Sequence, residues 1–509
     1  MSATTIATAP RREAGTERPP TRRGTTIAMA LCVVTILLAV LDSNIVSSAT
    51  VPIVRDLDPV HGVDRIPWLI AAYQLAATAA LPLYGKLCDT LGAKKVFLGA
   101  LATFLTGSAL CGMAQSMGEL IAARAFQGAG GGGLMSVTMV VLRQIGAAAG
   151  PKEGKDGKPG GGDRKGNIGG IIAGAGMALG PWLGGALADH AGWRWIFYVN
   201  LPVGIAVLVA AALVVDLPVR TTRHRIDFLG AGLAAAFSSA LLLVTEWGGE
   251  EYAWTSPVIT GLAVAAAVAL GLFLWRQATA AEPILPLSIF SLRPMRYGFA
   301  IQGLVGVAMM GSIVYVMIYL QVVRGVAATS AGLFLVPMAI GMTVVGLLSG
   351  RLVAAGWSQK TFVVSGSVFA SAALALLTTL DTDTGLWTVR GALLLMGIGF
   401  GQLIGQLIEL VQDTAPERQL GVATTGVRFF QTLGTALGAS LFGAVLSRVY
   451  AAQGPGGTTS DIARLTGPAR EEALDAFVSS TSAVFACATG AMVLALILAT
   501  RLPGARTKI

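Results

Sequence analysis

The chain has 509 residues, of which 54% are hydrophobic and only 12% charged, and its mean hydropathy is +0.70. This composition excludes an ordinary soluble domain and indicates a chain that is embedded in lipid. The formal net charge of +9 does not indicate a nucleic-acid partner, because Lys and Arg form short clusters between apolar stretches rather than one basic face.

Residues 1–25 are polar and rich in Arg and Pro, which predicts a disordered cytoplasmic tail. No small-residue cleavage site follows the apolar run that begins at Ile27, so we expect the first membrane helix to stay in the protein. The four cysteines have the spacing of neither a metal site nor a disulfide framework, and we expect them to be packing residues.

Long apolar stretches recur along the whole chain. A helix needs about 20 apolar residues to cross a hydrocarbon core of roughly 30 Å. Fourteen stretches meet this requirement, which predicts an all-α integral membrane protein with fourteen transmembrane helices. They cover residues 26–49, 66–84, 96–114, 118–142, 168–188, 193–216, 226–246, 256–275, 296–321, 330–350, 361–380, 388–412, 420–446 and 480–500.

The distribution of Lys and Arg predicts the orientation. If both termini are cytoplasmic, the inner segments contain 26 of the 36 Lys and Arg residues, and the outer segments contain eight. Positive charge gathers on the cytoplasmic side of membrane proteins, so this asymmetry supports both the orientation and the helix count.

The longer inner connections divide the helices into groups of six, two and six. We expect an N-terminal six-helix bundle over 26–217, a linker with helices seven and eight over 218–293, and a C-terminal six-helix bundle with a short tail over 294–509. The Gly- and Lys-rich connection 150–166 predicts a mobile loop, with weak contact to anionic lipid headgroups as the alternative.

Two motifs stand out in the first half of the chain. After the second predicted helix comes a loop with the sequence Gly85-Lys-Leu-Cys-Asp89-Thr-Leu-Gly92-Ala-Lys94-Lys95. In the fifth predicted helix, glycines recur every four residues on one face, where they allow a neighbouring backbone to approach closely. This helix also contains a proline that can bend it, and its motif consists of Gly176, Gly180, Pro181, Gly184 and Gly185.

Three further motifs are Leu41-Asp42-Ser-Asn-Ile-Val, Arg124-Ala-Phe-Gln127-Gly128 and the run from Trp193 to Pro202. Together with the two above, they resemble the major facilitator superfamily and, within it, the fourteen-helix drug:proton antiporter family. The resemblance implies two six-helix bundles around a central cavity, transport by alternating access, a gating role for the loop after helix two, and antiport through the glycine-rich helix five.

Asp42 and Arg124 are charged residues inside predicted helices, where each charge costs roughly 2.5–3.5 kcal/mol on insertion scales. Both lie about 10 Å below the outer surface, as the helical rise of 1.5 Å per residue places them, so they can form a pair. We expect this pair to couple transport to protons, as the resemblance implies; a purely structural ion pair is the alternative.

A second polar group is expected in the C-terminal bundle. Gln402, Gln406 and Glu409 follow the i, i+4, i+7 pattern of one helix face. With Arg428 of the next helix, they are the predicted residues of the substrate cavity. The alternative for Glu409 is a helix-end cap that pairs with Arg428.

These features predict a proton-coupled secondary transporter of the cell membrane that exports hydrophobic drugs or antibiotics, including cationic ones. Its expected partners are a small-molecule substrate and the lipid bilayer, without an obligate protein partner, a metal or a cofactor other than protons. The alternative within transport is an exporter of one metabolite, peptide or lipid.

An enzyme would need clustered His or Asp ligands, and an ATP-driven pump would need a P-loop. The sequence shows neither. A receptor or scaffold remains the other alternative.

Overall fold

The structure is a computed structural model. It describes residues 22–58, 66–148, 183–184, 186–187, 190–215, 227–249, 251–326, 332–454 and 465–503. The described part of the N-terminal bundle is helical throughout. Its helices are α1 (Arg22–Ser48), α2 (Thr50–Leu57), α3 (Ile66–Leu91), α4 (Ala93–Met113), α5 (Met117–Ala148), α7 (Trp195–Tyr198) and α8 (Asn200–Val214).

The second half of the chain forms a helix pair and a second bundle. The pair consists of α9 (Phe228–Trp247) and α10 (Pro257–Thr279). The C-terminal bundle contains the long helices α11 (Arg293–Val322), α13 (Val336–Ala354), α14 (Gln359–Leu377), α15 (Leu386–Thr414), α16 (Leu420–Gln453) and α17 (Pro468–Thr500). Short 3-10 turns precede three of them, η2 (Leu287–Ser291), η3 (Gly332–Leu335) and η4 (Glu417–Gln419).

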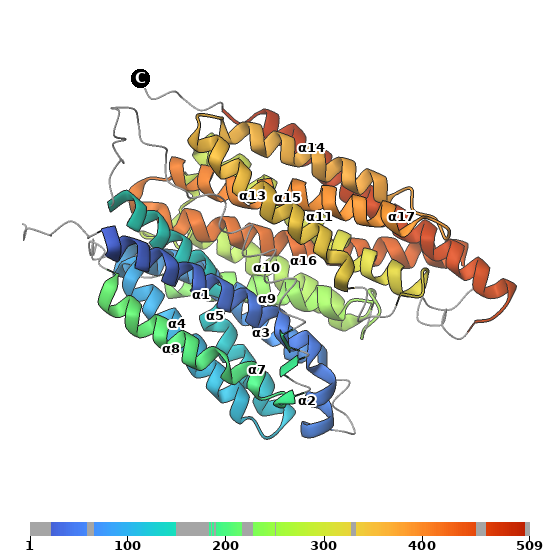
Figure 1. Cartoon of the computed structure of the whole chain (residues 1–509), viewed down its shortest axis with the longest axis horizontal. Coiled ribbons are helices and arrows are strands. Elements are labelled where there is room, and N and C mark those ends of the chain that lie inside the picture. The colour runs from blue at the N-terminus through green and yellow to red at the C-terminus, as the bar shows by residue number, and fades with distance from the viewer. Residues whose placement is uncertain are drawn as a thin grey trace, which may run out of the picture.

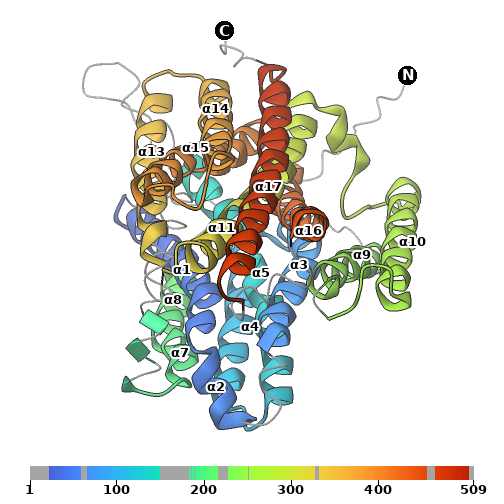
Figure 2. The ribbon, with the colours of Figure 1, turned by 90° about the vertical axis from the view of Figure 1, so that its right-hand side faces the viewer.

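The two bundles lie side by side, and their ends diverge towards α2 and the start of α17 (Figure 1). The pair α9–α10 stands at the side of the molecule, with α10 outermost (Figure 2). Helix α9 packs against α10, α3 and α16, so it joins the pair to both bundles. Each bundle has its own apolar core, and the larger one is formed mostly by α11 and α13–α17.

Twelve helices among the described residues are long and apolar enough to cross a membrane. Helix α3 is not one of these twelve, although it has 26 residues and packs within the bundle. The predicted fifth helix, residues 168–188, lies mostly outside the described residues. The multi-pass helical architecture is therefore confirmed, and the count of fourteen stays a prediction.

The glycines in the middle of α5 explain how closely this helix approaches α3. A Cβ atom added to Gly128 would lie 2.3 Å from the carbonyl oxygen of Tyr73, and one added to Gly132 would lie 2.3 Å from that of Ala77. No side chain fits such a contact, so glycine at every fourth position lets the two backbones touch. This close packing brings Tyr73 next to the charged residues of α5.

Candidate functional site: a buried charge cluster beside a cavity

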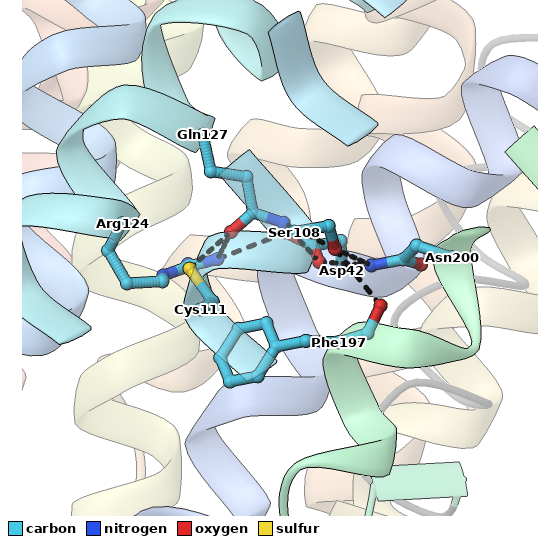
Figure 3. Close-up of polar contacts among 7 residues, drawn as sticks. All are labelled: Asp42, Ser108, Cys111, Arg124, Gln127, Phe197 and Asn200. Atoms are coloured by element: carbon cyan, nitrogen blue, oxygen red, sulfur yellow. Dashed lines mark hydrogen bonds and ion pairs between the residues drawn. The ribbon is translucent and has the colours of Figure 1, made fainter. Parts of the chain in front are cut away.

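The carboxylate of Asp42 lies at the centre of a buried polar cluster in the N-terminal bundle (Figure 3). The side chains of Asp42 and Arg124 are 0% and 2% exposed, and an Arg124 guanidinium nitrogen lies 3.1 Å from Asp42 Oδ2. The other carboxylate oxygen, Oδ1, accepts hydrogen bonds from the amide nitrogens of Gln127 at 2.9 Å and Asn200 at 2.7 Å. Helices α1, α5 and α8 thus converge on a single carboxylate.

Helix α4 contributes a serine that connects these groups. The hydroxyl of Ser108 accepts from the amides of Asn200 and Gln127, at 2.9 and 3.1 Å, and donates to the carbonyl of Phe197 at 3.0 Å. The cluster is therefore nearly saturated with hydrogen bonds. Such saturation is the condition under which a buried ion pair can be tolerated.

Arg124 is also held by aromatic rings. Its guanidinium carbon lies 4.2 Å from the centre of the Tyr73 ring, which is a cation–π contact. One guanidinium nitrogen donates to Gln127 Oε1 at 2.7 Å, and Nε has no hydrogen-bond partner among the described residues. The charge is thus positioned partly by ring faces, which hold it less rigidly than a second carboxylate would.

The predicted residues Asp42 and Arg124 therefore meet, as their depths suggested. In the sequence, Gln127 and Asn200 stand out only as parts of the family motifs, and no motif contains Ser108. The position of Gln127, one turn after Arg124, was a usable signal. Ser108 gave none, because serine is common in membrane helices for packing reasons alone.

The predicted gating loop is mostly helical, which corrects the expectation. Gly85 and Asp89 lie in the last two turns of α3, and Lys94 and Lys95 lie in the first turn of α4. Only Gly92 separates the two helices, with φ of +90°, a conformation that favours glycine. The apolar stretch ends near residue 84, whereas the backbone hydrogen bonds of α3 continue to Leu91. Hydropathy alone therefore placed the end of this helix too early.

Asp89 connects the two bundles at the end that is predicted to be cytoplasmic. Its two carboxylate oxygens accept hydrogen bonds from the backbone N–H groups of Gly421, at 2.7 Å, and Val422, at 3.0 Å. These amides belong to the first turn of α16, whose N–H groups have no partner within the helix. A Cβ atom on Gly85 would lie 2.2 Å from the hydroxyl of Thr425, so glycine is needed for this contact.

Ion pairs reinforce the same end of the molecule. Arg143 of α5 pairs with Asp413 of α15 at 2.5 Å, and Gln359 of α14 also donates to Asp413, at 2.8 Å. Lys86 of α3 lies 3.9 Å from Glu282, which follows α10. We call these contacts, together with that of Asp89, the cytoplasmic contact, after the side on which the distribution of Lys and Arg predicts it.

A cavity of about 190 Å³ lies between α1, α3, α5 and α16. Its lining includes Tyr73, Gln74 and Thr78 from α3, and Arg428 and Thr432 from α16. Because Tyr73 also stacks on Arg124, one side chain touches both the cavity and the buried charge cluster.

Of the four predicted cavity residues, Arg428 lines this cavity. Gln402 and Gln406 are instead buried inside the C-terminal bundle. Gln402 accepts from Ser365 at 2.5 Å, whereas the amide of Gln406 has no hydrogen-bond partner among the described residues. Glu409 lies on the same helix and is partly buried.

The predicted antiporter helix lies almost entirely outside the described residues. Gly184 is described and is buried. The other four predicted residues of that motif fall outside the described part of the chain, namely Gly176, Gly180, Pro181 and Gly185.

Comparison with known families identifies the fold. Residues 31–439, which are most of the chain, match the profile described as Major Facilitator Superfamily. The chain belongs to the major facilitator superfamily. The expectation of a transporter rather than an enzyme is therefore confirmed at the level of the superfamily.

Curated relatives in this superfamily come from bacteria and fungi. An uncharacterised MFS-type transporter of Mycobacterium tuberculosis is 36% identical over 432 residues, which cover 84% of this chain and 60% of the relative. The chain thus spans about 60% of the length of that protein. The multidrug transporter protein MdtP of Bacillus subtilis is 32% identical over 422 residues, which cover 83% of this chain and 75% of the relative.

A solved structure shares the fold. The human organic anion transporter MFSD10 superposes with a TM-score of 0.61 over 95% of this chain and 100% of that chain. The sequences are 15% identical, so the likeness shows the fold alone.

Proposed function

We propose that the chain is a proton-coupled exporter of hydrophobic small molecules, of the fourteen-helix antiporter type, in the cell membrane with both termini cytoplasmic. The observation that carries this proposal is the buried pair of Asp42 and Arg124. A carboxylate is the titratable group that can take up a proton there, and its surroundings exclude bulk water. A charged group inside a membrane helix is a functional residue by default.

Protonation of Asp42 would remove the negative charge that holds Arg124. The guanidinium would then keep its contacts with Gln127 and with the rings of Tyr73 and Phe197. Because Tyr73 lines the cavity, a shift of Arg124 would change the contacts between Tyr73 and a bound substrate. A bound substrate would in turn change the position of Arg124. This exchange of contacts is the coupling between proton and substrate.

Alternating access needs a contact that closes one side and can open. The cytoplasmic contact closes the predicted inner side, while the bundles diverge towards α2 and the start of α17 (Figure 1). This arrangement is what an outward-facing state requires. The inward-facing state would break the bonds of Asp89 and Arg143.

The names of the Bacillus subtilis relatives, a multidrug transporter protein and multidrug resistance protein 3, support drugs as the substrate class. An exporter of one metabolite, peptide or lipid is the alternative. Growth of an efflux-deficient bacterial host that expresses the chain separates the two. Resistance to several unrelated compounds supports the drug exporter, and protection against a single compound supports the alternative.

The coupling role is tested with Asp42→Asn. This variant keeps the shape of the side chain but cannot titrate, so we expect the protein to insert normally and to lose uphill transport. The measurement is uptake of a fluorescent drug into proteoliposomes under an imposed pH gradient. The matched control is Asp56→Asn, which changes an exposed carboxylate of α2 and should keep uphill transport. Uphill transport by Asp42→Asn at the rate of wild type would refute the proton-coupled mechanism.

A further inference from the structure

The same local arrangement of arginine and glutamine occurs twice in the molecule. In α5, a guanidinium nitrogen of Arg124 donates to Gln127 Oε1 at 2.7 Å. In α16, a guanidinium nitrogen of Arg428 donates to Gln431 Oε1, also at 2.7 Å. In both helices the glutamine follows the arginine by three residues, so it lies on the same face and steadies the cation.

The two arginines differ in their acidic partner. Arg124 pairs with the carboxylate of Asp42 at 3.1 Å. Among the described residues, Arg428 forms no ion pair with a carboxylate, and its side-chain partner is the neutral Gln431. The arrangement is complete in α5, whereas in α16 the position of the anion is open.

The open side of Arg428 faces the cavity between the bundles. Arg428 is the one charged residue among those that line it. The other polar lining groups are neutral and belong to Tyr73, Gln74, Thr78 and Thr432. Arg428 is therefore the one formal charge among the lining residues of this cavity.

Resting on the proposed function, we propose that the cavity binds an amphipathic small molecule through its anionic group, with a carboxylate or phosphate oxygen paired to Arg428. A guanidinium has five N–H donors in a planar fork, and Gln431 occupies one of them, so a bidentate anion can still be bound. The neutral polar groups of Gln74 and Thr432 can orient it.

The cavity also restricts the body of the ligand. Its volume of about 190 Å³ is below the roughly 300–1,000 Å³ of pockets for drug-sized ligands, which indicates a body of one or two rings. Leu81 and Met135 provide an apolar wall for such a body. The cationic substrates expected from the sequence would instead meet a like charge at Arg428.

The test is equilibrium binding to the full-length protein in neutral detergent, measured by calorimetry without a proton gradient. Three probes share one ring system and differ in charge: 2-naphthoate, naphthalene-2-carboxamide and 2-(aminomethyl)naphthalene. We expect 2-naphthoate to bind at least tenfold more tightly than the neutral carboxamide, and the amine to bind most weakly. Arg428→Gln should abolish the preference for the anion over the carboxamide.

Two further variants keep the test decisive. Arg428→Lys retains the positive charge without the planar fork and should keep part of the preference. Arg351→Gln removes an exposed arginine from the end of α13 and should keep all of it. If Arg428→Gln does not fold, wild type and Arg428→Lys still decide the outcome.

Equal affinity of wild type for 2-naphthoate and the carboxamide would overturn the inference, and so would an unchanged preference in Arg428→Gln. Competition by phosphatidylglycerol, but not by phosphatidylcholine, would overturn the small-molecule assignment in favour of a lipid headgroup. Anion binding without gradient-driven transport would refute the proposed proton coupling alone. Proton-driven transport with no preference for the anion would refute only this inference.

Discussion

Asp42 and Gln406 represent two opposite ways of placing polar atoms inside membrane helices. The carboxylate of Asp42 has bonds from α5 and α8, whereas the buried amide of Gln406 has no hydrogen-bond partner among the described residues. Both residues were selected from the sequence because polar residues are conspicuous in apolar runs. Their partners depend on how the helices pack, so sequence could predict the pair of Asp42 and Arg124 only from the depth of each residue.

Gln406→Leu should stabilise the protein. A buried amide without a partner is destabilising by about 1–3 kcal/mol, and leucine fills a similar volume without polar atoms. We expect the free energy of unfolding to rise by about 1 kcal/mol, which thermal unfolding in detergent would detect as a higher Tm. Gln402→Leu is the matched control on the same helix: it removes the bonds of Gln402 with Ser365 and with the Ile398 carbonyl, and it should lower the Tm. A lower Tm for Gln406→Leu would mean that its amide is bonded after all.

At the level of single helices, the largest difference from the sequence expectation is in α17, which begins at Pro468 instead of residue 480. Helices α3 and α2 also differ from it. Hydropathy ended α3 near residue 84, but the helix continues to Leu91 and brings Asp89 to the start of α16. Helix α2 was not expected, because its eight residues are too few to appear in a count of membrane-length stretches. Both differences lie where a helix leaves the lipid and hydrogen bonding, rather than hydropathy, decides its end.

Gly85→Ala should weaken the cytoplasmic contact. The added Cβ would lie 2.2 Å from the Thr425 hydroxyl and 3.0 Å from the Val422 Cα atom, and the backbone of α16 cannot rotate away. Overpacking of this kind costs typically 1–3 kcal/mol, so the open state should become roughly fivefold more populated or more.

Cys88 reports this opening, because it is buried at the contact beside Gly421. We expect N-ethylmaleimide to label Cys88 several-fold faster in Gly85→Ala than in wild type, both in a Cys487→Ser background. Gly99→Ala, where an added Cβ has no neighbour within 4 Å, is the matched control and should label at the wild-type rate. Equal rates in all three proteins would show that Gly85 does not limit the contact.

Asp56 of α2 should make the stability of the predicted outer end depend on pH. Hydrogen bonds from Trp193, at 3.0 Å, and Arg194, at 2.6 Å, lower the pKa of the Asp56 carboxyl. Because the folded-state pKa is lowered, this stabilisation is present above the unfolded-state pKa and is lost as pH falls through the folded-state pKa. Asp56→Asn should therefore lower the Tm slightly at pH 7, and the difference from wild type should shrink steadily as the pH is lowered below the unfolded-state pKa of about 4. A difference of constant size across this range would contradict the assignment.

For the whole molecule, the sequence predicted the multi-pass helical architecture correctly. The pair α9–α10 stands beside the bundles (Figure 2). The division into six, two and six helices stays a prediction. The cavity could not be predicted in the same way. Its lining combines residues of α1, α3, α5 and α16, and only Arg428 was conspicuous enough to be selected.

If the cavity takes an anion, transport should depend strongly on membrane potential. With one proton exchanged for one monovalent anion, two charges cross per cycle, so the potential contributes twice the roughly 2.3 kcal/mol per charge per 100 mV. We expect 2-naphthoate transport in proteoliposomes to accelerate when a potassium diffusion potential with valinomycin is imposed at constant pH. Naphthalene-2-carboxamide should show about half the dependence, and a cation none. Identical dependence for all three charges would exclude one-for-one exchange.

The bonds that Asp89 accepts from the first turn of α16 also bear on a transporter with no substrate to move. Burial raises the pKa of the Asp89 carboxyl to about 7, so this group is only partly ionised at neutral pH. A hydrogen bond contributes about 0.5–1.5 kcal/mol, so the two bonds would favour the closed inner side by roughly fivefold to a hundredfold. An idle copy would then rest sealed to the cytoplasm and admit few protons on its own. If the chain is the proposed proton-coupled exporter, a cell could therefore keep many idle copies in its membrane without a measurable proton leak.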